Sequence, residues 1–217
     1  MTEIRDYLRG LEVFAGDLPT FEPDTAPERP ETLFVDWLTK AVDAGVREAH
    51  AMTVSTIGAD GTPSARVLLL KNVDARGWQF AAHDSSPKGR DLAVHPVAAL
   101  TFYWPQQARQ IRVRGPVRAE SAQSSAADFL ARSPGSRAEA STGRQSRPLE
   151  DRQTLDLVTK QALERIADDP GLVVPEWTLY TVRAEQVEFW QADKQRKHTR
   201  LRYERYGATW TRGQLWP

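Results

Sequence analysis

Cationic and hydroxyl side chains, rather than nucleophiles, are the residues of this sequence whose types and spacing could do chemistry. Ser85-Ser86-Pro87-Lys88 places hydroxyls and an ammonium at a predicted helix start, where free backbone N–H groups attract phosphate. An ordinary helix cap followed by a solvated lysine is the simpler interpretation of that motif taken alone. Arg66 and Lys71 bracket the apolar run Val67–Leu70, and on a flat strand residues five apart point to opposite faces. They could serve one ligand only through a bulge or by approaching it from different sides.

A second cationic group lies toward the C-terminus, where Arg196, His198 and Arg200 alternate with other residues. If this stretch is extended, all three side chains point the same way, and two guanidiniums flanking an imidazole form an anion-binding row. A solvated strand face explains the alternation equally well. Trp190, just upstream, is either plain core or an indole whose edge packs on a cofactor ring.

A third polar pattern alternates along a predicted strand. Gln110, Arg112 and Arg114 share one face, and Ile111 and Val113 share the other. A solvated face explains this pattern as well as a ligand does. Each of the three patterns is weak alone, and their joint order along the chain is more informative.

Composition excludes several classes of site and partner. The chain has 217 residues and no cysteine, which excludes disulfides, thiolate metal ligands and cysteine nucleophiles. Its four histidines stand far apart, so no metal site is expected. The sequence also contains neither a nucleophile elbow nor a nucleotide-binding glycine motif. Equal numbers of basic and acidic residues, 29 each, argue against a broad nucleic-acid footprint. Short apolar runs and a charged start predict a cytoplasmic protein without membrane contact.

The hydrophobic pattern predicts an α+β fold. Hairpin-connected strands come in groups with helices between them, which is typical of an antiparallel barrel or sheet with packed helices. We expect residues 1–30 to be an extended, proline-rich lead-in and residues 31–217 to be one domain. Helices are expected at 31–44, 87–94, 122–132 and 150–167. For the helix at 122–132, we expect Ser121 to be the N-cap and residues 133–136 to end it. Strands are expected at 51–57, 65–72, 78–82, 97–104, 109–120, 182–191, 200–205 and 209–215.

The chain resembles the pyridoxamine 5′-phosphate oxidase family, whose fold is the FMN-binding split barrel. The likeness runs from about Thr32 to Pro217 in the family's order and spacing. Its most specific part is the C-terminal pattern W-Q-x-x-x-x-R-x-H-x-R, which begins at Trp190 and ends at Arg200. The motifs that carry it are Arg66-Val67-Leu68-Leu69-Leu70-Lys71, Ser86-Pro87-Lys88-Gly89-Arg90, Arg109-Gln110-Ile111-Arg112-Val113, Arg132, Ser136, Arg144-Gln145-Ser146, Val187-Glu188-Phe189-Trp190-Gln191 and Arg196-Lys197-His198-Thr199-Arg200.

The resemblance implies an antiparallel split β-barrel, a homodimer with two FMN sites at the subunit interface, and oxidation of pyridoxamine or pyridoxine 5′-phosphate to pyridoxal 5′-phosphate with O2 as acceptor. It assigns Arg196 and His198 to the reacting ring as catalytic residues, and Lys71, Arg132 and Ser136 to the substrate phosphate. The residues that it assigns to FMN are Arg66, Val67, Lys71, Ala81, Ala82, Lys88, Gln110, Gln145, Ser146, Trp190 and Arg200.

Three features depart from the family pattern, and one of them, Asp128, bears on the substrate. Asp128 stands where the family has a phosphate-clamping tyrosine, and an acid there repels a phosphate unless it turns away or pairs with Arg132. Pro87 replaces an arginine, and Ala81-Ala82 replaces an aromatic-hydroxyl pair. These changes leave two alternatives open. One is a flavin oxidase of another ring, like the phenazine-pathway members of the family, and the other is a non-catalytic FMN- or pyridoxal-phosphate-binding protein. The cations Arg5 and Arg9 could approach a substrate as part of a lid.

Overall fold

The computed structural model describes residues 3–217, which divide into two compact units. The first unit contains residues up to Met52, Thr101–Val113 and Glu185–Pro217. The second contains Thr53–Leu100 and Arg114–Ala184. Three strands contribute residues to both units: β1 (Ala51–Ile57), β5 (Val97–Trp104) and β6 (Arg109–Ala119). The expected boundary at residue 30 stays a prediction.

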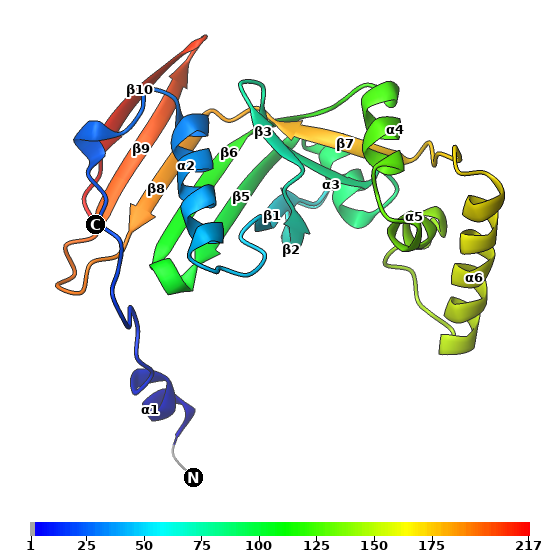
Figure 1. Cartoon of the computed structure of the whole chain (residues 1–217), viewed down its shortest axis with the longest axis horizontal. Coiled ribbons are helices and arrows are strands. Elements are labelled where there is room, and N and C mark those ends of the chain that lie inside the picture. Colours follow the sequence, from blue (N-terminus) through cyan, green and yellow to red (C-terminus); the bar gives the residue numbers. More distant parts are fainter. Residues whose placement is uncertain (1–2) are drawn as a thin grey trace. The chain divides into compact units, whose positions relative to one another are not determined.

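The first unit pairs the C-terminal strands with a helix from the N-terminal part of the chain. Its elements are α1 (Ile4–Arg9), a 3₁₀ turn at Pro23–Thr25, α2 (Pro30–Asp43), β8 (Gln186–Gln191), β9 (Thr199–Tyr206) and β10 (Thr209–Gln214). The strands β8, β9 and β10 lie side by side as an antiparallel set (Figure 1). The register places Trp190 opposite Arg200, so these two residues are neighbours across the strands.

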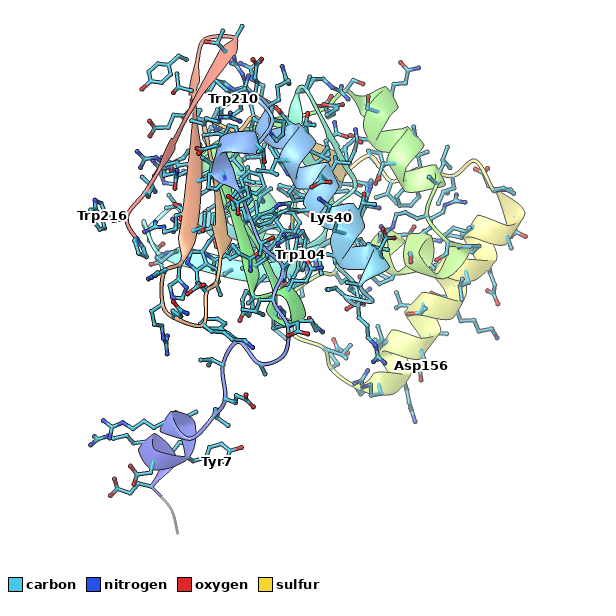
Figure 2. All side chains as sticks on the ribbon, turned by 60° about the vertical axis from the view of Figure 1, so that its left-hand side comes forward. Tyr7, Lys40, Trp104, Asp156, Trp210 and Trp216 are labelled. Carbon is cyan, nitrogen blue, oxygen red and sulfur yellow. The ribbon has the colours of Figure 1, made fainter. Side chains whose placement is uncertain are left out.

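Aromatic packing holds the first unit together. The α2 helix starts at Pro30, whose missing N–H is tolerated in a first turn, and it buries Phe34 and Trp37. The Trp37 ring lies 5.2 Å from the Phe189 ring on β8, in an edge-to-face arrangement. Burying one such side chain stabilises the fold by roughly 1.5–3 kcal/mol. Trp104 is buried and donates its indole N–H to the Ala49 carbonyl at 2.9 Å, whereas Trp216 projects outward (Figure 2).

The second unit combines short antiparallel strands with four helices. Its elements are β2 (Pro63–Leu69), β3 (Asn72–Asp74), β4 (Gly77–His83), α3 (Pro87–Val94), α4 (Ala122–Leu130), α5 (Pro134–Ser141), α6 (Arg152–Asp168) and β7 (Trp177–Val182). The β4 strand pairs with β3 and β7. Gly77, at φ +144°, lies so close to β7 that a Cβ would meet the Val182 carbonyl oxygen at 2.0 Å, so only glycine fits there.

Most predicted elements are confirmed, and the fold is the α+β architecture that the pattern indicated and the split barrel that the resemblance implied. The α3 helix spans the predicted residues, and the Ser121 hydroxyl caps α4 by accepting from the Ser124 N–H. Two predictions were incomplete. The segment 133–136 ends one helix but also starts another, because the Ser133 side chain caps α5. The predicted strand 182–191 is confirmed only over Gln186–Gln191 (β8), and the separate strand β7, which ends at Val182, was not predicted. The α1 helix and the 3₁₀ turn were not expected in the lead-in.

Candidate active site

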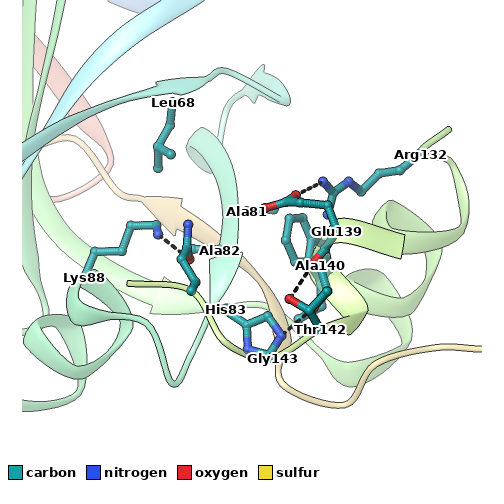
Figure 3. Close-up of a pocket in the computed structure, with 12 residues that line it drawn as sticks. Leu68, Ala81, Ala82, His83, Lys88, Arg132, Glu139, Ala140, Thr142 and Gly143 are labelled. Atoms are coloured by element: carbon teal, nitrogen blue, oxygen red, sulfur yellow. Dashed lines mark hydrogen bonds and ion pairs between the residues drawn. The ribbon is translucent and has the colours of Figure 1, made fainter. Parts of the chain in front are cut away.

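A pocket of about 190 Å³ in the second unit gathers several of the residues that the sequence singled out. Its walls come from β2, β4, the start of α3, α5 with the loop after it, and Trp177 on β7. In Figure 3, Lys88 and Arg132 lie on either side of Ala81 and Ala82. Gln145 also lines the pocket. Five predicted site residues therefore line one space, and two of them, Ala81 and Ala82, have small side chains.

The Lys88 ammonium is buried at the start of α3. Its Nζ donates to the Ser86 hydroxyl at 3.2 Å and to the Gln145 side-chain oxygen at 3.1 Å, both of which are neutral. Within residues 3–217 no carboxylate forms an ion pair with it. Burial lowers the pKa of Lys88, the Arg66 charge lowers it further, and Glu139 acts in the opposite direction. A buried lysine with neutral partners gains from an anion, so the solvated-lysine interpretation is wrong.

Arg66 is held on β2 by hydroxyl groups. Its guanidinium donates to the Thr56 hydroxyl at 2.7 Å and to the Ser64 hydroxyl at 2.6 Å, and lies 3.9 Å from the Asp91 carboxylate. Burial lowers the pKa of Arg66, and Asp91 raises it. Val67, which follows, is exposed. The structure thus fixes Arg66 through neighbouring strand residues.

Lys71, Asp128, Trp177, Arg132 and Glu139 form a connected group that we call the charge cluster. Asp128 Oδ1 lies 3.3 Å from Lys71 Nζ, and Oδ2 accepts a hydrogen bond from the Trp177 indole at 2.8 Å. Arg132 stacks on the same indole with its guanidinium carbon 4.0 Å from the ring centre. Asp128 therefore pairs with Lys71 rather than with Arg132, and Lys71 is not an isolated cation.

Arg132 is the less satisfied cation of the charge cluster. Its Nη2 lies 3.6 Å from the Glu139 carboxylate, whose side chain is 72 % exposed. Its Nη1 is buried and has no hydrogen-bond partner within the described part of the chain. Burial lowers the pKa of Arg132, although Glu139 and Asp128 raise it. An unsatisfied guanidinium nitrogen beside a pocket is a ready donor for an anionic ligand.

The remaining predicted residues of this unit lie at the edges of the pocket. The Ser136 hydroxyl accepts a hydrogen bond from the Ser133 hydroxyl at 3.0 Å, within the cap of α5. Ser146 is exposed and adopts φ +65° in the loop after α5. His83 was not predicted, yet it lines the pocket and its Nε2 lies 3.1 Å from the Ala140 carbonyl oxygen. Because a carbonyl only accepts, Nε2 carries the proton, and the ring ties β4 to α5.

In the first unit, Arg196 and His198 lie in the turn before β9. The stretch from Arg196 to Arg200 is not extended throughout, because β9 begins at Thr199 and Arg196 adopts φ +67°, so the condition for one shared face is not met. His198 Nδ1 accepts the Asp193 backbone N–H at 3.0 Å, which leaves Nε2 as the proton-bearing nitrogen of the neutral ring.

Aromatic rings surround that turn. The His198 ring lies 5.0 Å from the Trp190 ring and 5.7 Å from the Phe14 ring. The Arg196 guanidinium lies 5.8 Å from the Phe14 ring centre. Phe14 itself is held at φ +57°, a backbone region that favours glycine. Phe14 was not predicted, because nothing in the local sequence around it indicates a contact with residues near the C-terminus, such as Trp190 and His198.

Arg200 is oriented by a buried acid that the sequence analysis also missed. Glu188 Oε1 accepts from Arg200 Nε at 3.0 Å, and Oε2 accepts from Arg112 Nη2 at 2.6 Å. The Glu188 side chain is only 6 % exposed. Gln110 is half-buried on the neighbouring β6. A single charged residue among the otherwise uncharged residues of β8 was the available signal, since buried acids are rare without partners.

The chain is similar to known proteins over most of its length. Residues 38–165 match the family model described as pyridoxamine 5′-phosphate oxidase, and residues 177–217 match the pyridoxine 5′-phosphate oxidase C-terminal dimerisation region. The chain is 44 % identical over 199 residues to a pyridoxine/pyridoxamine 5′-phosphate oxidase of Burkholderia multivorans, covering 90 % of this chain and 92 % of that protein. A Pseudomonas syringae pv. tomato protein of the same name is 42 % identical, with 88 % and 90 % covered.

Solved structures show the same fold. PhzG from Burkholderia lata 383, in complex with tetrahydrophenazine-1-carboxylic acid, superposes with a TM-score of 0.85 and 33 % identity, covering 93 % of this chain and all of that one. An FMN-binding protein of Nostoc punctiforme related to pyridoxamine 5′-phosphate oxidase gives a TM-score of 0.72 at 19 % identity, with 88 % of this chain and all of that one covered. The protein is thus an FMN-dependent oxidoreductase of the split-barrel class. It belongs to the pyridoxamine 5′-phosphate oxidase family.

No group of histidine and acidic side chains within residues 3–217 has an arrangement that could hold a metal ion. None of the helices in that range has the length and apolar character needed to span a bilayer.

Proposed function

We propose that this protein oxidises pyridoxamine or pyridoxine 5′-phosphate to pyridoxal 5′-phosphate, with O2 as the final acceptor. The observation that carries the proposal is that the buried Lys88 and the half-buried Arg132 both line one pocket, so each can offer a cation to a different phosphate. Flavin mononucleotide and this substrate each bring a phosphate, so the reaction needs two separate anion sites. The names of the Burkholderia and Pseudomonas relatives support the same substrate.

The donor set of the second unit fits FMN. Lys88, with its neutral partners Ser86 and Gln145, offers an ammonium to a phosphate, and the N-terminus of α3 adds backbone N–H groups. Arg66 and Ser146 supply further donors, and the small Ala81 and Ala82 leave room for a ring. By family resemblance Val67, Lys71, Gln110, Trp190 and Arg200 complete the FMN-binding set.

The bound flavin would supply the redox chemistry by accepting two electrons from the substrate carbon. The residues of this chain bind and orient. Arg132, Lys71 and Ser136 would hold the substrate phosphate, while Arg196 and His198 would orient the ring. The fixed tautomer of His198 presents an N–H donor at Nε2, which suits an oxygen or nitrogen acceptor on the substrate.

The overall chemistry balances with oxygen and water alone. Pyridoxine 5′-phosphate and O2 give pyridoxal 5′-phosphate and H2O2. Pyridoxamine 5′-phosphate gives an imine, which water hydrolyses to the aldehyde and ammonia. The C-terminal dimerisation match supports a homodimer as the working form. A chain without cysteine suits the reducing cytoplasm, where we expect the enzyme to act.

Anaerobic mixing of the FMN-loaded protein with pyridoxamine or pyridoxine 5′-phosphate tests the proposal. We expect the flavin absorbance near 450 nm to bleach and to return when air is admitted. A flavin that stays oxidised with both compounds contradicts the proposal. Bleaching would also exclude a role as a non-catalytic carrier of FMN or pyridoxal phosphate.

A second candidate function is oxidation of a reduced, carboxylated ring. The Lys71–Asp128 ion pair favours it, because the paired acid offsets one of the cations expected to hold a phosphate. The similarity to PhzG, whose structure contains tetrahydrophenazine-1-carboxylic acid, points the same way. The same anaerobic experiment with a dihydrophenazine carboxylate decides between the two, since the better substrate bleaches the flavin faster.

A further inference from the structure

Asp128 occupies the centre of the charge cluster and uses both of its carboxylate oxygens. Oδ1 contacts the Lys71 ammonium at 3.3 Å and Oδ2 accepts the Trp177 indole N–H at 2.8 Å. The Asp128 side chain is 13 % exposed, so water screens its charge poorly. The indole bond keeps the carboxylate in place instead of leaving it free to turn toward solvent.

The cluster as a whole carries no net formal charge. Lys71 and Arg132 contribute two positive charges, and Asp128 and Glu139 contribute two negative ones. The two acids differ in their surroundings, because Glu139 is mostly exposed and Asp128 is mostly buried. Glu139 can swing into water when a ligand arrives, whereas Asp128 is tied to the same indole on which Arg132 stacks.

We propose that Asp128 is a specificity-determining residue that makes the anion site of this enzyme select ligands by their charge, disfavouring dianions more than monoanions. The inference rests on the proposed function only in placing the ligand's anionic group at Lys71 and Arg132. The electrostatic energy between a fixed charge and a ligand is proportional to the ligand's charge. Removing Asp128's charge therefore multiplies the affinity for a dianion by the square of the factor for a monoanion.

Two ligands with the same ring isolate this effect. Pyridoxal 5′-phosphate carries two negative charges on its phosphate at pH 8, and its phosphate monomethyl ester carries one. Both would be titrated calorimetrically into the FMN-loaded protein and into the FMN-loaded Asp128→Asn variant. Asparagine can still accept the Trp177 hydrogen bond through its amide oxygen, so the substitution changes charge more than shape.

We expect Asp128→Asn to tighten pyridoxal 5′-phosphate about tenfold and the monomethyl ester about threefold. The matched control is Asp74→Asn, which removes an aspartate that also pairs with a cation, Arg76 at 2.8 Å, outside the charge cluster. That control should leave both dissociation constants unchanged. Equal factors for the two ligands, or weaker binding of pyridoxal 5′-phosphate, would overturn the proposal.

A second variant of opposite sign checks that the ligand's anionic group lies at the charge cluster, on which the inference depends. Lys71→Met removes one positive charge from the cluster, so it should weaken binding of the dianion by the square of the factor by which it weakens binding of the monoanion. Failure of the proposed function is seen separately, because neither pyridoxamine 5′-phosphate nor pyridoxine 5′-phosphate would then reduce the flavin. If flavin reduction fails but the change in dianion affinity is still the square of the change in monoanion affinity, selection by charge is supported and only the proposed function is refuted. If neither ligand binds to any variant, both proposals fall.

Discussion

The two groups of candidate residues satisfy their cations in different ways. In the second unit, Lys88 has only neutral partners and Arg132 has an unpaired buried nitrogen. In the first unit, Arg200 is paired with the buried Glu188, and His198 has a fixed hydrogen bond. The second unit is therefore electrostatically incomplete until an anion binds, whereas the first is already organised. The contrast suggests that one group supplies binding energy and the other supplies geometry.

The largest expected effect comes from removing the side chains of the first unit that we assign to orienting the substrate ring. Arg196→Ala and His198→Ala should each slow flavin reduction by pyridoxamine 5′-phosphate about 100-fold, because the reacting carbon loses its orientation. Anaerobic stopped-flow absorbance measures the rate, and flavin fluorescence measures retained FMN. FMN should stay bound in both variants. Loss of FMN from both would place these residues with the cofactor instead of the substrate.

Lys88→Met tests the cations of the second unit that we assign to binding anions. It removes a buried ammonium that we assign to the FMN phosphate, and a charge-assisted hydrogen bond is worth about 2 kcal/mol, or roughly 30-fold in affinity. Equilibrium flavin fluorescence measures the dissociation constant of FMN. Lys160→Met is the control, since Lys160 is exposed on α6 and pairs with Glu164 on the same helix. Unchanged affinity in Lys88→Met would refute the assignment.

The pH dependence of FMN binding sharpens the same assignment. Burial lowers the pKa of Lys88, so its ammonium is lost at a lower pH than that of an ordinary lysine. FMN affinity is thus full below that pKa and falls as the pH rises through it, approaching about tenfold per pH unit. Arginine keeps its charge as the pH rises through that pKa, so Lys88→Arg should flatten the curve there. Parallel curves for both proteins would exclude Lys88 as the titrating group.

Glu188→Gln tests whether the first unit is organised before the ligand arrives. Its carboxylate orients Arg200 and Arg112, so its loss should weaken FMN about fivefold and destabilise the fold by about 1 kcal/mol. The melting temperature should fall by about 2–4 °C. Glu204→Gln, which removes an exposed partner of Arg202, serves as the control. A fold that is destabilised while FMN affinity stays constant would limit Glu188 to a structural role.

The same contrast explains how far the sequence could lead. Helix caps and apolar periodicity are local, so α3 and α4 were predicted closely, and the W-Q-x-x-x-x-R-x-H-x-R pattern marked Arg196 and His198. Pairings between distant residues leave no local trace. The Lys71–Asp128 and Asp128–Trp177 contacts join residues 57 and 49 positions apart, as their numbers show. The left-handed turn at Arg196 was missed because alternation alone does not distinguish a strand from a turn beside one.

Phe14→Ala has the smallest expected effect. It tests whether the Phe14 ring helps substrate binding by ordering Arg196 or opposes it by competing with the substrate. Phe14 lies beside His198 and Arg196. If its ring orders Arg196, losing a cation–π contact of about 0.5–1 kcal/mol should weaken substrate binding about threefold and leave the rate of flavin reduction at saturation nearly unchanged. Val13→Ala, at the exposed neighbouring position, is the control. Tighter substrate binding in Phe14→Ala would show the opposite, that the ring competes with the substrate and must leave before the reaction.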